Sequence, residues 1–172
     1  MTAFAFIYHK FKIIGIEYPL STVVLRPTHI TMKELLRIVF IDDDQEDLQM
    51  LREIAESLGH SAYLLHDPRT IWEQLNKDAL NPDIIFLDIN LPLTDGFEIL
   101  KKLRETGNTT PVVIHSGNCD ERCIDTAFSL GANYYMKKAN SYQAVVSAFE
   151  YVFGRDWNTF RPAREEFLHL NN

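Results

Sequence analysis

Cysteine is scarce in this sequence. The 172 residues include only Cys119 and Cys123. Two cysteines do not make a disulfide framework, and they do not complete the ligand set of a structural zinc site. We therefore expect two small, half-buried thiols.

Long hydrophobic runs and an excess of positive charge are missing as well. No segment reaches the roughly 18 apolar residues of a membrane span. The N-terminal segment lacks the charged start, apolar block and small-residue cleavage site of a signal peptide. We expect a cytoplasmic protein without membrane association. The net charge of −7 argues against a general nucleic-acid role, because phosphate backbones require a basic patch.

The remaining composition is that of a globular domain. Hydrophobic residues make up 46% of the chain, enough to bury a core. Strand and helix signals alternate over residues 32–154, the predicted domain. Residues 1–31 do not fit this pattern. We expect a poorly packed extension or a mis-assigned start, with translation beginning at Met32, and the intact mass of the native protein decides between them. Residues 155–172 form a short aromatic tail, too short for a DNA-binding domain with its own core.

Four apolar runs and one weaker, more polar segment, residues 61–65, predict strands within residues 32–154, and helical periodicity separates them. Strands divided by helices favour parallel pairing with right-handed crossovers. We predict an α/β fold: a flavodoxin-like, doubly wound, five-stranded parallel sheet of order 2-1-3-4-5, with helices on both faces. The predicted strands are 38–41, 61–65, 83–87, 112–115 and 133–136; the helices are 45–58, 68–75, 97–104, 120–130 and 141–153.

Polar residues stand at the ends of four of these strands. The carboxyl ends of parallel strands meet in one crevice, where ligands bind. Neighbouring carboxylates repel one another unless a cation is present, and their oxygens suit Mg²⁺. A lysine and a hydroxyl nearby suit a phosphoryl group. The residues are Asp42 and Asp43 after the first strand, Asp88 after the third, Ser116 after the fourth and Lys137 after the fifth.

Each of these residues also has an ordinary structural explanation. A single Asp after a strand is usually a turn residue or a helix cap. Asp44 fits that role as N-cap of the first predicted helix, with Asp47 three residues later. Four polar strand ends in the right order are much harder to explain structurally, and together they favour a functional site.

The same residues resemble the receiver domain of two-component response regulators, which are bacterial signalling proteins. The resemblance runs from about Arg37 to Phe153 and is specific because several motifs occur together. The motifs are Val39-Phe40-Ile41-Asp42-Asp43-Asp44, Pro82-Asp83-Ile84-Ile85-Phe86-Leu87-Asp88-Ile89-Asn90-Leu91-Pro92, Asp95-Gly96-Phe97-Glu98, Val113-Ile114-His115-Ser116-Gly117 and Gly131-Ala132-Asn133-Tyr134-Tyr135-Met136-Lys137.

The resemblance implies a role for each residue of the site. Asp88 would be the phosphoacceptor. Asp42, Asp43, Asp88 and the backbone carbonyl of Asn90 would bind Mg²⁺. Ser116 and Lys137 would bind phosphoryl oxygens, and Tyr134 would be the switch aromatic. The output surface would cover roughly residues 120–153. Lys138 stands in the place of the family's usual proline, and we predict a trans peptide bond before it.

The resemblance also implies partners. We expect a phosphoprotein that catalyses only its own phosphoryl transfer and loss. It would be a single-domain response regulator that receives its phosphoryl group from a sensor histidine kinase or a phosphotransfer protein. It would act on a downstream protein target. A homodimer is left open. The alternatives are a receiver-like module that binds partners without phosphorylation, and an aspartyl-phosphate phosphatase. Asn90 argues against the phosphatase, because it stands where such an enzyme has its acid and cannot exchange a proton.

Overall fold

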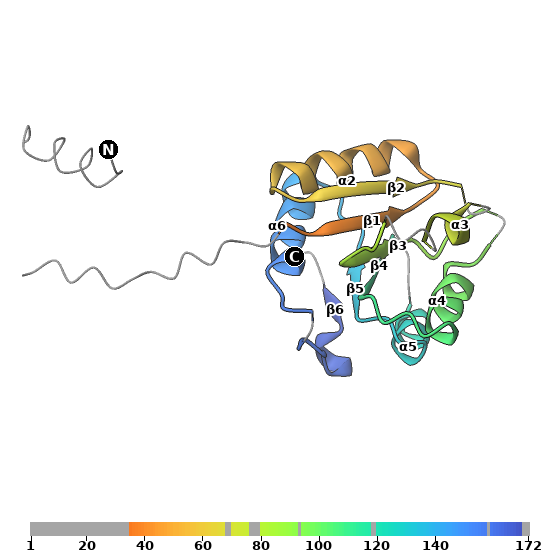
Figure 1. Ribbon diagram of the computed structural model, residues 1–172. Helices are drawn as coiled ribbons and strands as arrows, with labels where there is room; N and C mark the ends of the chain where they lie inside the picture. The colour runs from red at the N-terminus through yellow and green to blue at the C-terminus, as the bar shows by residue number, and fades with distance from the viewer. Residues whose placement is uncertain are drawn as a thin grey trace, which may run out of the picture. The chain divides into compact units, whose positions relative to one another are not determined.

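The computed structural model describes residues 35–67, 70–75, 80–92, 94–117, 120–157 and 159–169. The prediction for residues 1–31 lies outside this range. Within it, one parallel sheet is flanked by helices (Figure 1). The strands are β1 (Arg37–Ile41), β2 (Ser61–Leu65), β3 (Ile84–Leu87), β4 (Val112–Ser116), β5 (Tyr134–Lys137) and β6 (Leu168–His169). The helices are α2 (Gln45–Ser57), α3 (Ile71–Leu75), α4 (Gly96–Glu105), α5 (Glu121–Ser129), α6 (Tyr142–Phe153) and the 3-10 helix η1 (Arg164–Glu166).

The order of the strands is β2-β1-β3-β4-β5-β6. The predicted order 2-1-3-4-5 is therefore confirmed, and β6 extends it beside β5. Ile41 at the end of β1 is in register with Leu65 of β2 and Leu87 of β3. The carboxyl ends of the central strands consequently lie side by side, as the predicted site requires.

Helices cover both faces of the sheet because alternate strand residues point to opposite sides. Phe40 and Phe86 point to the side of α2 and α6, where both rings pack against Phe149 of α6, with centroids 5.7 and 5.1 Å away. Residues such as Ile85 and Ile114 point to the other side, where α3, α4 and α5 pack. In Figure 1, α4 and α5 lie together on the side of the sheet opposite α2.

The aromatic tail packs on the domain. Trp157 is buried, and its indole N–H donates a hydrogen bond to the carbonyl of Val152, 3.0 Å away. Phe167 is fully buried, and β6 follows it directly. The predicted boundary at residue 154 therefore marks the end of α6 but not the end of the packed structure.

Cys123 is disulfide-bonded, which corrects the expectation of two free thiols. The only other cysteine of the chain, Cys119, lies outside the described residues. Asp120 is the N-cap of α5, and its side chain accepts a hydrogen bond from the Cys123 N–H. The cysteine therefore lies in the first turn of that helix.

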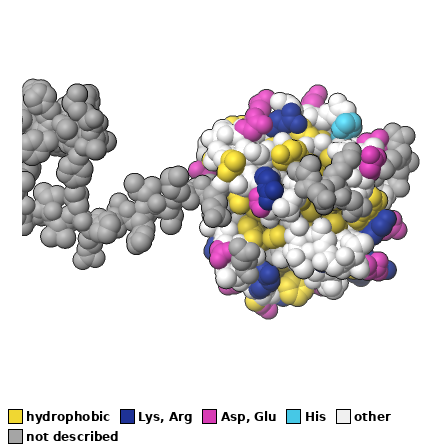
Figure 2. Space-filling model, in the orientation of Figure 1, with side chains coloured by type: hydrophobic (Ala, Val, Ile, Leu, Met, Phe, Trp, Pro, Cys, Tyr) yellow, Lys and Arg dark blue, Asp and Glu magenta, His cyan; other side chains and the backbone are white. Residues whose placement is uncertain are grey.

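Acidic and basic side chains are interspersed over the face of the molecule seen in Figure 2, with apolar side chains between them. This arrangement agrees with the composition, in which 17 basic and 24 acidic side chains give a net charge of −7. Of the helices that the structure describes, none is both long enough and apolar enough to cross a bilayer.

Candidate functional site

Three carboxylates meet at the ends of β1 and β3. Asp42 and Asp88 are each the first residue after their strand, and the Asp88 N–H donates a hydrogen bond to the Ile41 carbonyl, 2.9 Å away. One oxygen from each of Asp42, Asp43 and Asp88 lies within 4.8 Å of the other two. Asp42 and Asp88 are buried, whereas Asp43 is exposed. The structure thus brings together the acidic cluster that the sequence predicts, and these oxygens are close enough to share a cation.

Lys138 supplies a positive charge to this cluster. Its ammonium lies 2.7 Å from Asp42 Oδ2, 2.9 Å from Asp88 Oδ2 and 3.1 Å from Asp47 Oδ2. The side chain is 22% exposed, so it reaches the carboxylates from a half-buried position. The predicted residue, Lys137, is exposed. The lysine of the site is therefore one residue later than predicted.

The reason for this correction is the length of β5. The sequence predicts that the strand ends at Met136, but it continues through Lys137, whose Cα is in register with Ser116. Lys138 is then the first residue after its strand, the same position that Asp42 and Asp88 occupy after theirs. The bond between the two lysines is trans, as predicted. The residue in the family's proline position becomes Ala139.

Tyr135, rather than Tyr134, is the tyrosine next to the site. Its hydroxyl donates a long hydrogen bond, 3.4 Å, to the Ser116 carbonyl. Tyr134 points to the opposite face of the sheet, where it stacks on Tyr151 with centroids 5.8 Å apart. The prediction of Tyr134 is thus corrected by one residue, for the same reason as the lysine.

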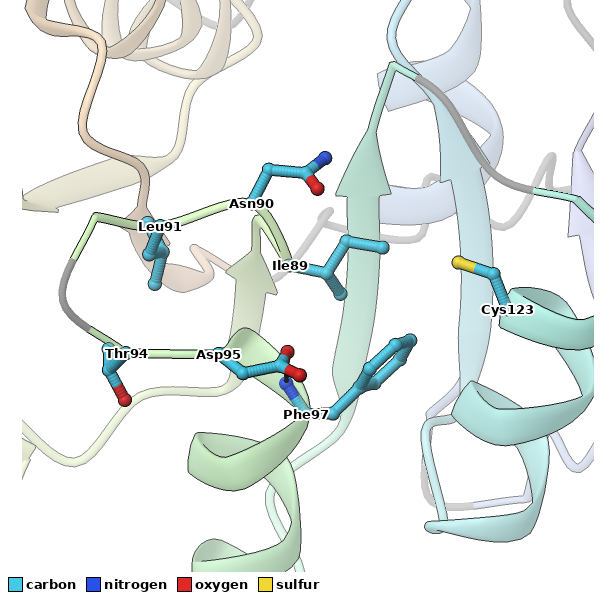
Figure 3. A pocket seen from close by; sticks show the side chains of 7 residues that line it. All are labelled: Ile89, Asn90, Leu91, Thr94, Asp95, Phe97 and Cys123. Atoms are coloured by element: carbon cyan, nitrogen blue, oxygen red, sulfur yellow. Dashed lines mark hydrogen bonds between the residues drawn. The ribbon is translucent and has the colours of Figure 1, made fainter.

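Ser116 and Asn90 complete the site. Ser116 is the last residue of β4 and is fully buried. Its Oγ accepts a hydrogen bond from the Asn90 side-chain amide, 2.8 Å away, and the Asn90 N–H donates to Asp88 Oδ1 at 3.0 Å. In Figure 3 the Asn90 side chain points from the loop after β3 toward the end of β4. The Asn90 carbonyl as a metal ligand stays a prediction.

Asp44 has the structural role that the sequence predicts. It is the N-cap of α2, and its Oδ1 accepts the N–H groups of Glu46 and Asp47 at 2.8 and 3.1 Å. This cap fixes the first turn of α2, where Asp47 contacts Lys138. Asp47 is a site residue that the prediction missed as such, because it was considered only as part of the cap.

Residues 38–150 match a family model described as the response regulator receiver domain. The chain belongs to this family. The predicted receiver resemblance is thereby confirmed over most of the described structure.

Relatives of this receiver domain include the transcriptional regulatory protein TrcR of Mycobacterium tuberculosis, 29% identical over 131 residues, which are 76% of this chain and 50% of TrcR. The transcriptional regulatory protein CpxR of Escherichia coli is 29% identical over 69% of this chain and 50% of its own. Among solved structures, the chemotaxis response regulator CheY4 of Vibrio cholerae superposes with a TM-score of 0.61 at 20% identity, over 69% of this chain and 99% of CheY4. The chain spans about half the length of the two regulators, and CheY4 shows the shared fold.

Opposing effects set the charges of the receiver site. Burial raises the pKa of Asp42 above its ordinary value, although Lys138 works against this rise. Burial also acts to raise the pKa of Asp88, but hydrogen bonds from the Asn90 N–H and Lys138 outweigh it and hold that pKa below its ordinary value. Burial disfavours the Lys138 charge, yet its contacts with Asp42 and Asp88 raise its pKa. Asp88 is therefore an ionised, oriented carboxylate at neutral pH.

A hollow of about 460 Å³ opens beside the loop after β3 (Figure 3). It lies between this loop and the first turns of α4 and α5, and Asn90 is the residue that its lining shares with the site. Its lining residues are Ile89, Asn90, Leu91, Thr94, Asp95, Phe97 and Cys123.

Proposed function

We propose that this receiver domain accepts a phosphoryl group on Asp88 from a phosphohistidine of a sensor histidine kinase or phosphotransfer protein. The observation that carries the proposal is the Asp88 carboxylate itself. One of its oxygens is held by the Asn90 N–H and the other lies 2.9 Å from Lys138. A fixed, ionised carboxylate beside a lysine is a suitable nucleophile for phosphoryl transfer, which depends on positioning and charge neutralisation.

In the proposed step an oxygen of Asp88 forms a bond to phosphorus while the bond between phosphorus and the histidine nitrogen breaks. The released imidazole takes up a proton from solvent. Lys138 is placed to compensate charge on the phosphoryl oxygens, and the Ser116 hydroxyl can leave Asn90 to donate to another. Mg²⁺ held by Asp42, Asp43, Asp88 and the Asn90 carbonyl would supply the remaining neutralisation.

In this proposal the protein acts as a phosphorylation-dependent switch, and it has no external substrate as an enzyme would. Its phosphoryl group changes a surface that a downstream protein reads, or moves on to another protein. A phosphatase would require a proton donor near Asp88. The residue two positions later is Asn90, whose amide donates to Ser116 and cannot exchange a proton. The cytoplasmic location and the single-domain organisation stay predictions.

Incubation with Mg²⁺ and a small acyl phosphate, followed by intact-mass measurement, tests this proposal. We expect the wild type to gain the mass of one phosphoryl group and Asp88→Asn to gain none. Asp95→Asn is the matched control, because Asp95 caps α4 close to the site and Asn is an equally good cap. An unmodified wild type, or equal modification of the Asp88→Asn variant, would contradict the proposal.

A further inference from the structure

The C-terminal residues 164–169, named here the clasp, cover the outer side of β5 and part of α5. We infer that the clasp detaches when Asp88 carries a phosphoryl group. Detachment uncovers β5 as an edge strand, to which an extended strand of a partner protein, carrying an aromatic side chain, can bind. This inference rests on the proposed function and adds the surface that the phosphoryl group controls. In Figure 1, β6 lies beside β5, and the chain between α6 and β6 runs along the same side of the domain.

Two side chains anchor the clasp to α5. Phe167 is fully buried, and its ring meets the ring of Phe128 edge-on with centroids 5.2 Å apart. The Arg164 guanidinium donates to Asp125 Oδ1 from Nε at 2.7 Å and lies 3.2 Å from Glu121 Oε2. An aromatic anchor and an exposed ion pair hold the segment in one place, and the ion pair is weak enough to release.

Backbone pairing attaches the clasp to β5. The Tyr135 N–H donates to the Phe167 carbonyl at 2.8 Å, and Tyr135 and Met136 are in register with Leu168 and His169. β6 is only two residues long, so this pairing is short. Without it, β5 would present unpaired backbone groups and an empty site for an aromatic side chain, which is a surface that a partner strand can join.

Tyr135 connects the clasp to the receiver site. Its N–H holds Phe167, while its hydroxyl reaches the carbonyl of Ser116. The side chain is 1% exposed and packs in the same core as Phe167. Movement of Tyr135 therefore disturbs both contacts together, because close-packed cores do not deform gradually.

The observed positions of Ser116 and the clasp belong to one arrangement of the site. Here the Ser116 Oγ accepts from Asn90. A phosphoryl group on Asp88 offers oxygens to the Ser116 hydroxyl, so it favours another position of Ser116. Tyr135, whose hydroxyl contacts the Ser116 carbonyl, then changes position as well. The clasp then loses the surface on which it is docked. Linkage requires the reverse effect as well: weakening the clasp must favour occupancy of the site.

Hydrogen exchange on the full chain tests the first direction, with beryllofluoride and Mg²⁺ as the phosphoryl mimic. We expect residues 164–169 and the Tyr135 amide to exchange about fivefold faster or more when beryllofluoride is bound. β2, the strand at the other edge of the sheet, is the internal control and should not change.

A pair of charge-matched variants tests the reverse direction. Arg164→Gln should lower the beryllofluoride concentration for half-occupancy about two- to fivefold, because it removes only an exposed ion pair. Arg122→Gln changes the same charge on an exposed position of α5 and should leave that concentration unchanged.

The outcomes separate this inference from the proposed function. Phosphorylation of Asp88 with unchanged clasp exchange, or equal behaviour of the two arginine variants, overturns the inference alone. A wild type that takes up neither phosphoryl group nor beryllofluoride overturns both. A doubled molecular mass with the clasp still protected would mean that a second copy supplies the segment, which contradicts release.

Discussion

Lys138 is the residue on which the charge balance of the site depends. Its ammonium lies within 3.1 Å of carboxylate oxygens of Asp42, Asp47 and Asp88. Burial disfavours the charges of Asp42, Asp88 and Lys138. Their mutual contacts outweigh that cost for Asp88 and Lys138 and reduce it for Asp42. Lys138, which follows β5, therefore links the carboxyl ends of β1, β3 and β5 to the first turn of α2.

Replacing this lysine should impair phosphorylation much more than replacing its neighbour. We expect Lys138→Ala to lower the rate of phosphorylation by a small acyl phosphate about a hundredfold, because a positioned donor to the phosphoryl oxygens is lost. Lys137→Ala should stay within about twofold of the wild type, as an exposed substitution does. Stopped time courses of intact mass at saturating Mg²⁺ measure both rates. Comparable losses in the two variants would show that the site does not use Lys138 specifically.

At the scale of elements, the start of α4 packs closely against the loop that follows β3. A Cβ atom on Gly96 would lie 2.3 Å from the Asp88 carbonyl oxygen and 2.6 Å from the Ile89 Cα. Both are backbone atoms, so neither can rotate away. The glycine thus allows α4 to begin close against the backbone of Asp88, the proposed phosphoacceptor.

Gly96→Ala should therefore destabilise the fold and reduce phosphorylation of Asp88. We expect a loss of about 1–3 kcal/mol in the free energy of unfolding, the usual cost of overpacking. Gly117→Ala is the matched control, since an added Cβ there meets no atom of the described residues within 4 Å. Urea unfolding measures the difference, and equal stability of the two variants would contradict the close approach.

The clasp should behave as a separately detachable element. Phe167→Ala removes its buried anchor, and we expect residues 164–169 to lose protection from hydrogen exchange while β1 to β5 keep theirs. Phe149→Ala, in the central core, should instead lower the free energy of unfolding of the whole domain by about 3–5 kcal/mol. Loss of protection throughout the sheet in Phe167→Ala would show that the clasp belongs to the main cooperative unit.

The elements could be predicted from sequence where their signal is strong, and the errors fall where it is weak. Apolar runs such as Ile84–Leu87 specify buried strands without further information. β6 could not be predicted, because two residues such as Leu168 and His169 become a strand only when β5 is beside them. The lysine and tyrosine errors have one cause: a strand end misplaced by one residue moves every side chain to the other face.

At the scale of the whole molecule, a buried histidine makes stability depend on pH. Burial lowers the pKa of His115 to about 3, and the Lys138 charge adds to this effect. The unfolded chain binds a proton at this residue below about pH 6.5, whereas the folded protein does not. Protonation therefore favours the unfolded state, and the contribution of neutral His115 to stability is lost progressively from about pH 6.5 down to about pH 3.

We expect the free energy of unfolding to fall by about 2 kcal/mol between pH 7 and pH 5, at roughly 1.4 kcal/mol per pH unit below the unfolded pKa. His115→Leu should remove most of this fall. The ring is buried against Phe86, and its Nε2 has no hydrogen-bond partner among the described residues, so leucine leaves no polar group unpaired. Urea unfolding of the wild type and the variant at pH 7 and pH 5 measures this change in the free energy of unfolding. Identical pH dependence in the variant would exclude His115 as the cause.

The central claim is that Asp88, at the carboxyl ends of the central strands, is the residue that becomes phosphorylated. The most direct measurement locates the modification after treatment with Mg²⁺ and an acyl phosphate, by reductive trapping of the acyl phosphate and fragmentation of the peptide that spans β3. We expect a single modified residue, Asp88, whose modification disappears when Mg²⁺ is chelated. Modification at Asp42, Asp43 or any other residue in place of Asp88, or none at all, would contradict it.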